Sequence, residues 1–365
     1  MLRIILYAAL ASFFLLFTAD FCLAQAISRC RPSPPLPQNP KPGVIGLDLS
    51  RDGKTLVSAG TDGIIRIWNI RTGQITRTLT GHTNAIYRAV FSPNEKLIAS
   101  SSRDQTARIW DFETGRELYK LTGFKCSVKS VAFSSNGEML AGVGNDGILK
   151  VWSVKTGQEL KSLVHTDSPD TDNSVYSVAF SRDGRKIYAG NGDGTISEWD
   201  VKGGKETNVW KAHKETIIAL AFSPDYRLLA SDGYNEANVK LWDVKTRREL
   251  RSFGGKTDEK LLEQSHTVAV SPNGKMITAS VTGFDEKQNR FVYTRTYVWN
   301  TRTGEKLFTF EGQKFDIGGL VFTPDNRYLI SGSADTTIKF YDLKAGREVR
   351  TLTQPLLNST TLKAN

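Results

Sequence analysis

The chain has 365 residues, a formal net charge of +10 at pH 7 and a pI of about 9.4. Length alone would suggest two or three domains, but a repeat array of this size can form one closed unit. The basic charge permits an acidic partner without requiring one. The uncharged run from Ile4 to Phe17 is too short to span a bilayer comfortably, which argues against a transmembrane helix.

The first 26 residues have the three parts of a secretory signal peptide. Arg3 gives a positive start, the apolar run follows, and small residues permit cleavage after Ala24 or after Ala26. We therefore expect residues 1–26 to be removed and the protein to be exported, to the periplasm or out of the cell. No stable membrane span is then expected after cleavage. An uncleaved signal anchor that tethers the protein to the membrane is the alternative.

The segment after the signal peptide differs from the rest of the chain. Residues 27–42 contain six prolines and predict an extended linker. Cleavage leaves two cysteines, Cys30 and Cys126. In an oxidising compartment they can form a disulfide, or they can remain two thiols, because the sequence supplies no distance between them.

A repeat of about forty residues fills the chain from 43 to 353, and residues 354–365 follow it as a C-terminal tail. Its aromatic landmark recurs at Trp68, Trp110, Trp152, Trp199, Trp242, Trp299 and Tyr341. Subtraction gives intervals of 42, 42, 47, 43, 57 and 42 residues. A period in the low forties built from short β-type runs is typical of propeller blades.

Each repeat divides into four strands, here named a to d in chain order. In the second repeat we expect these strands from Ile86 to Ser92, Leu97 to Ser101, Thr106 to Asp111 and Glu117 to Leu121. Strands b and c lack apolar/polar alternation, which suits sheets that are buried on both faces. The first strand a begins at Val44 and the last strand d ends at Leu352, so every blade should be contiguous in sequence.

The motifs of the second repeat are those of a known family. They are Gly81-His82, Phe91-Ser92-Pro93, Ala99-Ser100, Asp104 and Trp110-Asp111. Over residues 43–353 the chain resembles the WD40-repeat proteins, in an exported, bacterial-type form. The resemblance implies an all-β, seven-bladed β-propeller of four-stranded antiparallel blades around a central channel. It also implies a rigid, non-catalytic scaffold that binds protein partners.

The resemblance further implies a structural tetrad, which carries over in full only in the second repeat. Its members there are His82, Ser100, Asp104 and Trp110. Phe124 takes the place of His in the third repeat, and Glu236 and Tyr293 take the place of Asp in the fifth and sixth. We expect packing to hold those two blades and their geometry to be irregular.

The sequence favours no catalytic, metal or cofactor site. The His, Ser and Asp of the tetrad resemble a catalytic triad in composition, but in the family they satisfy one another beneath a turn. No pair of His or Cys residues has metal-ligand spacing, and one Asp per hairpin is too few for calcium. A propeller enzyme with a site at the central channel is the less favoured alternative.

Three insertions distinguish this array from a uniform one. They occupy residues 164–174, 254–264 and 281–292. The first two are connections from strand d to the next strand a, and the third enlarges a b-to-c hairpin. Both kinds of connection emerge on one face of a propeller. Insertions on one face mark the binding face, unless they are drift in tolerant loops.

On this face we predict a recognition surface for a protein partner around the channel, because aromatic and Arg side chains dominate interface energetics. Its candidate residues are Tyr87, Arg103, Lys129, Asn145, Tyr176, Ile218 and His266. An ordinary mixed surface is the alternative interpretation.

Cations gather instead on the c-to-d turns and outer strands, which belong to the opposite face and the rim. They are Arg71, Lys155, Lys202, Lys205, Lys245, Arg247, Arg248, Arg251, Arg302 and Lys344. This basic rim can bind an acidic envelope polymer or carbohydrate, or it can be a solvated edge guarded against strand addition. Nucleic acid is not an expected partner of an exported protein.

Overall fold

The computed structural model describes residue 36 and residues 41–165, 173–255 and 261–355. These residues belong to one compact unit, 33–365, and the unit formed by residues 1–32 lies outside the described part. The expected signal peptide and most of the linker and tail therefore also lie outside it. Among the described residues, no helix is long and apolar enough to cross a membrane.

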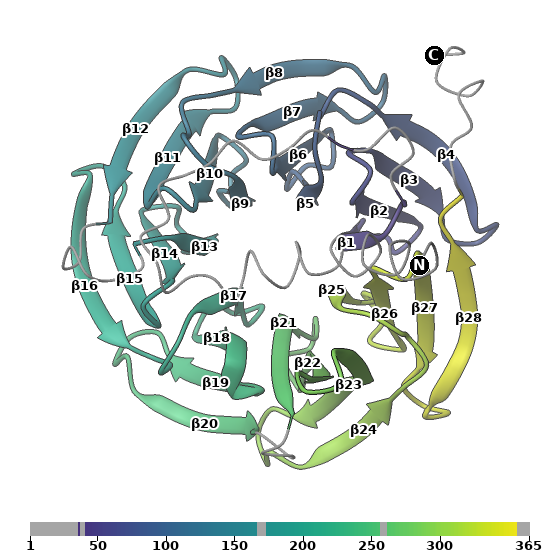
Figure 1. Ribbon diagram of the computed structural model, residues 1–365. Coiled ribbons are helices and arrows are strands. Elements are labelled where there is room, and N and C mark those ends of the chain that lie inside the picture. The colour runs from purple at the N-terminus through teal and green to yellow at the C-terminus, as the bar shows by residue number, and fades with distance from the viewer. Residues whose placement is uncertain (1–35, 37–40, 166–172, 256–260, 356–365) are drawn as a thin grey trace, which may run out of the picture. The chain divides into compact units, whose positions relative to one another are not determined.

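Seven four-stranded antiparallel sheets surround a central axis (Figure 1). Blades 1 to 3 consist of β1 (Val44–Leu49), β2 (Thr55–Gly60), β3 (Ile65–Asn69), β4 (Gln74–Leu79); β5 (Ile86–Phe91), β6 (Leu97–Ser102), β7 (Ala107–Asp111), β8 (Glu117–Leu121); β9 (Val128–Phe133), β10 (Met139–Gly144), β11 (Ile148–Ser153), β12 (Glu159–Val164). Blades 4 and 5 consist of β13 (Val175–Phe180), β14 (Lys186–Asn191), β15 (Thr195–Asp200), β16 (Lys205–Lys211); β17 (Ile217–Phe222), β18 (Leu228–Gly233), the 3-10 helix η1 (Tyr234–Glu236), β19 (Asn238–Asp243), β20 (Glu249–Gly254). Blades 6 and 7 consist of β21 (Leu262–Val270), β22 (Met276–Asp285), β23 (Arg290–Asn300), β24 (Lys306–Phe310); β25 (Ile317–Phe322), β26 (Tyr328–Ser333), β27 (Thr337–Asp342), β28 (Arg347–Thr353).

The strands of each blade follow one another in space as they do in sequence. The first strand of each blade lies nearest the axis and the fourth lies at the rim (Figure 1). The predicted seven-bladed, all-β propeller is therefore confirmed. So is the expectation that every blade is contiguous and that the ring closes without a borrowed strand.

Burial explains why the central strands show no alternation. In β2, β6 and β10, all residues after the first are buried, whereas β16 at the rim alternates regularly between exposed and half-buried positions. The central strands are covered on both faces because their neighbours are other blades. The hydrophobic clusters accordingly join adjacent blades, and Trp110 of blade 2 packs with Ile67 and Val57 of blade 1.

The seam between the last and first blades is closed in the same way. One buried cluster contains Ile330 and Phe340 of blade 7 together with Val44 and Trp68 of blade 1. At the rim, Arg350 of β28 donates a hydrogen bond to the carbonyl of Ile70 in blade 1. Apolar packing thus continues around the whole ring.

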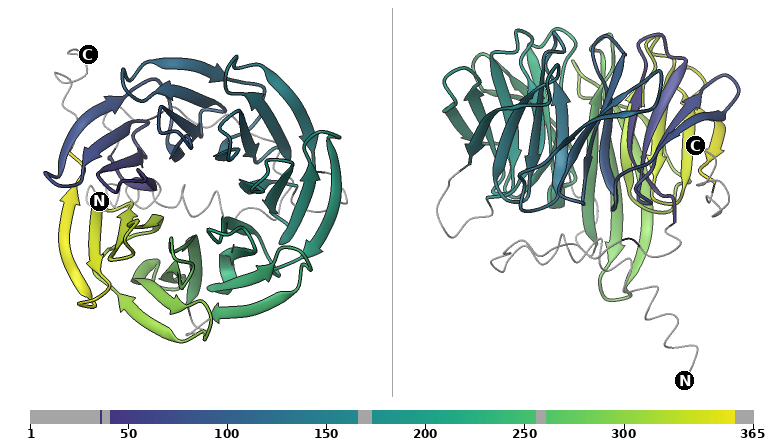
Figure 2. Two further views of the ribbon diagram at one scale, coloured as in Figure 1. Left: turned by 180° about the vertical axis from the view of Figure 1, so that it is seen from behind. Right: turned by 90° about the horizontal axis from the view of Figure 1, so that it is seen from above.

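Blade 6 is taller than its neighbours. β22 and β23 have 10 and 11 residues, and their ladder continues to the pair Asp285↔Arg290. The expected b-to-c enlargement is therefore an extended hairpin, which projects beyond the disc (Figure 2). β21 begins at Leu262, so the end of the predicted 254–264 insertion continues this sheet. Residues 166–172 and 256–260 of the other insertions lie outside the described residues.

A buried carboxyl lies where blade 5 meets blade 6. Asp232 of β18 is fully buried, and its Oδ2 accepts a hydrogen bond of 2.7 Å from the Ser265 hydroxyl of β21. Burial raises the pKa of this carboxyl well above its ordinary value of 3.8 and outweighs the hydrogen bonds from Ser265 and Thr267. The folded protein therefore retains a proton that the unfolded chain releases above about pH 4.

Replacement of Asp232 by Asn should stabilise the protein more at pH 7 than at pH 4. A raised folded pKa means that wild-type stability falls as pH rises from the unfolded toward the folded pKa, by about 1.4 kcal/mol per pH unit. The amide does not titrate and lacks this loss. Urea unfolding of both proteins across this pH range measures the difference, and a difference that does not change with pH would contradict the assignment.

Candidate functional site

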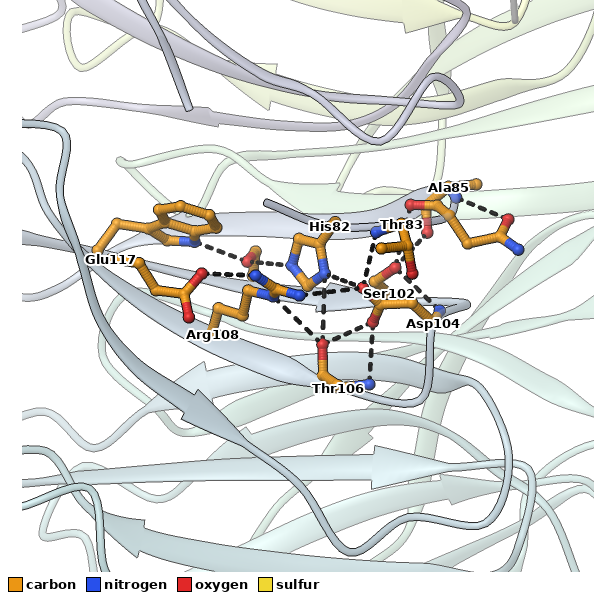
Figure 3. A network of polar contacts seen from close by, with 11 residues as sticks. His82, Thr83, Ala85, Ser102, Asp104, Thr106, Arg108 and Glu117 are labelled. Atoms are coloured by element: carbon orange, nitrogen blue, oxygen red, sulfur yellow. Dashed lines mark hydrogen bonds and ion pairs between the residues drawn. The ribbon is translucent and has the colours of Figure 1, made fainter. Parts of the chain in front are cut away.

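The turn that begins blade 2 is held by a chain of buried hydrogen bonds. Trp110 Nε1 donates to Ser100 Oγ at 2.9 Å, and Ser100 Oγ lies 2.7 Å from His82 Nε2. His82 Nδ1 lies 2.8 Å from Asp104 Oδ2. Asp104 also accepts hydrogen bonds from Thr106 and from the Thr83 N–H (Figure 3). The structure thus brings together the four predicted tetrad residues.

Burial and hydrogen bonds determine the pKa values of Asp104 and His82 in this network. Burial disfavours the ionised form of Asp104, but hydrogen bonds from His82, Thr106 and Thr83 outweigh it, so its pKa lies well below the ordinary value. Burial lowers the pKa of His82 despite the neighbouring carboxylate. A neutral His82 then donates from Nδ1 to Asp104 and accepts from the Ser100 hydroxyl at Nε2.

The network does not expose a nucleophile. Ser100 has no solvent-accessible surface, and its hydroxyl oxygen accepts a hydrogen bond from the edge of the buried Trp110 ring. A substrate cannot reach this oxygen without opening the blade. The Ser100, His82 and Asp104 side chains therefore satisfy one another's buried polar groups and are not arranged for acyl transfer.

The expectation that the tetrad is complete only in blade 2 is wrong for blade 5. His213 Nε2 lies 2.8 Å from Ser231 Oγ, which accepts a hydrogen bond of 2.8 Å from Trp242 Nε1. Glu236 replaces the Asp, with its Oε2 3.3 Å from His213 Nδ1. Its other oxygen accepts from the Lys214 N–H, and hydrogen bonds outweigh burial to lower the pKa of Glu236 to about 2.

The sequence carried a signal for this second tetrad. His213 precedes Ser231 by 18 residues, as His82 precedes Ser100. The b-to-c turn of blade 5 has one residue more, with η1 and Ala237 at φ +49°, and the longer Glu side chain still reaches the histidine. Blade 5 is thus irregular, as predicted, but packing does not hold it alone.

Other blades fill the histidine position differently. In blade 3 the Phe124 ring packs against Trp152 at 5.8 Å, and a Cβ on Gly142 would meet that indole at 2.8 Å. In blade 7, Gln313 Oε1 accepts a hydrogen bond of 2.7 Å from Ser331. An apolar contact and an amide thus replace the imidazole.

Three of the predicted partner-binding residues form one cluster on consecutive inner strands. Lys129 Nζ of β9 donates to the Tyr87 hydroxyl of β5 at 3.1 Å and lies 4.2 Å from the centroid of that ring. The Tyr176 ring of β13 lies 5.8 Å from the same ammonium. All three side chains are half-buried at the start of their strands. Three blades therefore present a cation between two aromatic rings.

The remaining candidates lie elsewhere around the ring. His266 of β21 lies near Asp316, with Nε2 and Oδ1 3.2 Å apart, and its ring is 6.1 Å from that of Tyr234. Ile218 occupies the corresponding half-buried position on β17. Asp316 and Tyr234 could not be predicted from the sequence, because neither belongs to a repeated motif.

Two further candidates, Arg103 and Asn145, belong to the b-to-c turns of blades 2 and 3. Their backbone N–H groups donate to the carbonyls of Ala85 and Ser127 at 2.9 and 3.2 Å. These turns lie on the same face as the starts of the inner strands, since d-to-a and b-to-c connections share a side of each antiparallel sheet.

The basic rim is in part a set of contacts between blades. Arg251 Nη1 and Nη2 donate to the carbonyls of Thr303 and Arg302 in blade 6, at 3.0 and 2.9 Å. Arg247 Nη2 lies 3.4 Å from the buried Glu198 carboxylate of blade 4. Two of the predicted polymer-binding cations therefore tie blades together.

Neither a metal centre nor a titratable thiol occurs in the described part of the chain. No group of three or more His, Cys, Asp or Glu side chains there is placed to hold a metal ion. Cys126 is disulfide-bonded. Cys30, its candidate partner from the sequence, lies outside the described residues.

Seven contiguous four-stranded blades, with His–Ser–Asp/Glu–Trp networks beneath two of their turns, define a WD40-repeat propeller. The family model described as "IFT122 first beta-propeller" matches residues 43–287, and the model described as "WD domain, G-beta repeat" matches residues 304–342. The first match covers more than half of the chain, which therefore belongs to the family of the IFT122 first beta-propeller.

Several curated proteins are similar to part of the chain. A guanine nucleotide-binding protein subunit beta of Zea mays is 26% identical over 163 residues, which are 43% of this chain and 39% of that protein. Protein tipD of Dictyostelium discoideum is 31% identical over 146 residues, 39% of this chain and 21% of that protein. Protein HIR1 of Candida albicans is 28% identical over 142 residues, 35% and 14% of the two lengths. The chain thus spans less than half of each relative.

Removing the carboxylate should cost blades 2 and 5 similar amounts of stability. Asp104→Ala and Glu236→Ala each leave buried donors unpaired, and we expect a loss of about 1–3 kcal/mol in the free energy of unfolding. Asp146→Ala in blade 3 is the matched control, since Phe124 leaves its carboxylate with backbone donors such as the Lys125 N–H at 2.7 Å. Urea unfolding at pH 7 tests this. A Glu236→Ala loss as small as that of Asp146→Ala would show that the glutamate does not replace the aspartate.

Proposed function

We propose that this protein is an exported, non-catalytic scaffold that binds a protein partner on the face of the d-to-a and b-to-c connections. WD40 propellers generally bind other proteins, and the proteins similar to this chain include a guanine nucleotide-binding protein subunit beta. The cluster of Lys129 with Tyr87 and Tyr176 carries the choice of face. An envelope polymer or carbohydrate as the principal ligand is the alternative.

The cluster has the properties of an interface anchor. Two tyrosines offer large, half-buried rings with few rotatable bonds, so contact with a partner costs little side-chain entropy. Lys129 is held in place by the Tyr87 hydroxyl and gives the site a positive charge. We propose that the partner packs against the two rings and presents an acceptor to the ammonium group.

Two observations support export. Residues 1–26 have the organisation of a secretory signal, and Cys126 is disulfide-bonded. Disulfides persist in oxidising compartments such as the periplasm and the cell exterior. We propose Cys30 as the partner of Cys126, since it is the only other cysteine left after cleavage at Ala24 or Ala26.

The Tyr87→Ser, Tyr176→Ser double variant should lose the partner and keep the fold. Both side chains are half-buried on inner strands, so we expect a small decrease in melting temperature and at least a tenfold loss of affinity for the partner. Capture from envelope extracts, quantified by mass spectrometry against the wild-type protein, identifies the proteins that depend on the two rings. Their affinities are then measured with purified components.

The matched control reverses charge at Lys245 and Arg248, on the opposite face. Both are exposed, and neither has the inter-blade role of Arg247. If this variant loses the partner and the tyrosine variant retains it, the binding face is the other one.

If the protein is exported, its mature N-terminus should be the one that signal-peptide cleavage produces. Sequencing of the protein isolated from its native host should begin at Gln25 or Ile27, as cleavage after Ala24 or Ala26 requires. An intact Met1 in the membrane fraction would instead identify an uncleaved signal anchor.

A further inference from the structure

One tyrosine on the opposite face has an unfavourable backbone conformation. All seven a-to-b turns have a residue with positive φ at the same position. Four of these residues are glycines, Gly53, Gly137, Gly184 and Gly274, and the other three are Glu95, Tyr226 and Asn326. Blade 5 instead has Tyr226 at φ +60°, a conformation that bulky residues adopt at a cost. Such a residue persists where its side chain has a use.

The Tyr226 ring lines an open cavity of about 530 Å³ between blades 4 and 5. Its centroid lies 5.2 Å from that of Phe222 at an interplanar angle of 34°, and Val244 adds a third apolar surface. The cavity is largely open to solvent, which suits one ring of an extended ligand rather than an enclosed small molecule. The cavity is therefore lined by two aromatic side chains that pack on each other, Tyr226 and Phe222.

Polar groups of both signs surround this floor. Arg182 and Asp183 of blade 4 and Asp225 of blade 5 line the cavity. Asp225 Oδ1 accepts from the Ser223 hydroxyl at 2.6 Å and from the Arg227 N–H at 3.1 Å, which lowers the pKa of this carboxyl. In the described part of the chain its Oδ2 has no hydrogen-bond partner, so it can accept from a ligand hydroxyl.

The surrounding turns are positively charged. Five exposed cations stand on the a-to-b turns of blades 4 and 5 and on the c-to-d turn of blade 5, against two exposed carboxylates, Asp183 and Asp225. The cations are Arg182, Arg185, Arg227, Lys245 and Arg248. An anionic ligand is favoured here by the excess of positive charge.

We propose that this cavity binds an acidic saccharide, with one pyranose ring stacked on Tyr226. The ring of a sugar has an apolar C–H face that fits an aromatic floor, its hydroxyls fit the Asp183 and Asp225 acceptors, and a uronate carboxylate fits Arg182. A phosphate-rich polymer fits less well, because it offers fewer hydroxyl donors to the Asp183 and Asp225 carboxylates than a sugar ring does. The site is distinct from the partner-binding face and does not depend on it.

Isothermal titration of the purified protein with two uronate oligosaccharides, tetragalacturonate and a hyaluronan tetrasaccharide, tests the proposal. The informative variant is Tyr226→Gly, because glycine is the residue of four other blades at this position and relieves the positive-φ strain. We expect an unchanged or raised melting temperature together with a loss of affinity of roughly tenfold or more. Asn326→Gly, at φ +58° in the same position of blade 7, is the matched control and should leave binding unchanged, although it removes the hydrogen bond of 3.0 Å that Asn326 Oδ1 accepts from the Asn273 N–H.

Charge recognition is tested separately with Arg182→Gln. This variant should weaken binding of tetragalacturonate and leave binding of its methyl ester unchanged. The proposal is overturned if the wild-type protein binds neither oligosaccharide, or if Tyr226→Gly binds as well as wild type. Tight binding to phosphatidylserine vesicles that survives Tyr226→Gly would likewise overturn it and identify a general basic surface. The Tyr87→Ser, Tyr176→Ser variant should bind saccharide normally, so the two proposals can fail independently.

Discussion

Contact between neighbouring blades is the interaction on which the rest of this structure depends. In blades 1 to 3, strands b and c are buried on both faces, so each of these blades is complete only when both neighbours cover it. The same packing recurs at the seam, where Trp68 of blade 1 lies in a buried cluster with Phe340 of blade 7. A closed ring of this kind needs no additional stabilising contact at any one blade.

Because contacts between neighbouring blades hold the ring together, the polar networks can differ from blade to blade. Beneath the turn that begins each blade, the protein needs a group that satisfies or covers the strand-b position. His82 does so with two hydrogen bonds, Gln313 with an amide and Phe124 with a ring. Because inter-blade packing continues around the ring whichever group is present, each solution is compatible with the fold. The turns and connections are then free to carry binding groups.

The sequence predicted the parts of the structure that repeat and missed those that depend on one blade alone. The periodic tryptophans were enough for blade number, strand order and the positions of Tyr87, Lys129 and Tyr176 on inner strands. Glu236 was misjudged because a pattern of residue types does not show that a turn longer by one residue lets the longer carboxylate reach His213. Arg247 was misjudged because its buried partner, Glu198, lies 49 residues away. Such contacts form because neighbouring blades bring distant residues together, so residue spacing within one repeat does not predict them.

The departures from the repeat are therefore the informative positions, and they are of two kinds. Glu236 and Gln313 change the residue type but preserve a buried hydrogen bond, so the fold accounts for them. Tyr226 stands at a positive φ where four other blades have glycine; its ring packs on Phe222 at the edge of a core cluster but makes no buried hydrogen bond. A backbone outlier that the fold does not require is a candidate for a functional role. By this criterion Tyr226 is a stronger indication of a ligand site than any residue of the repeated motif.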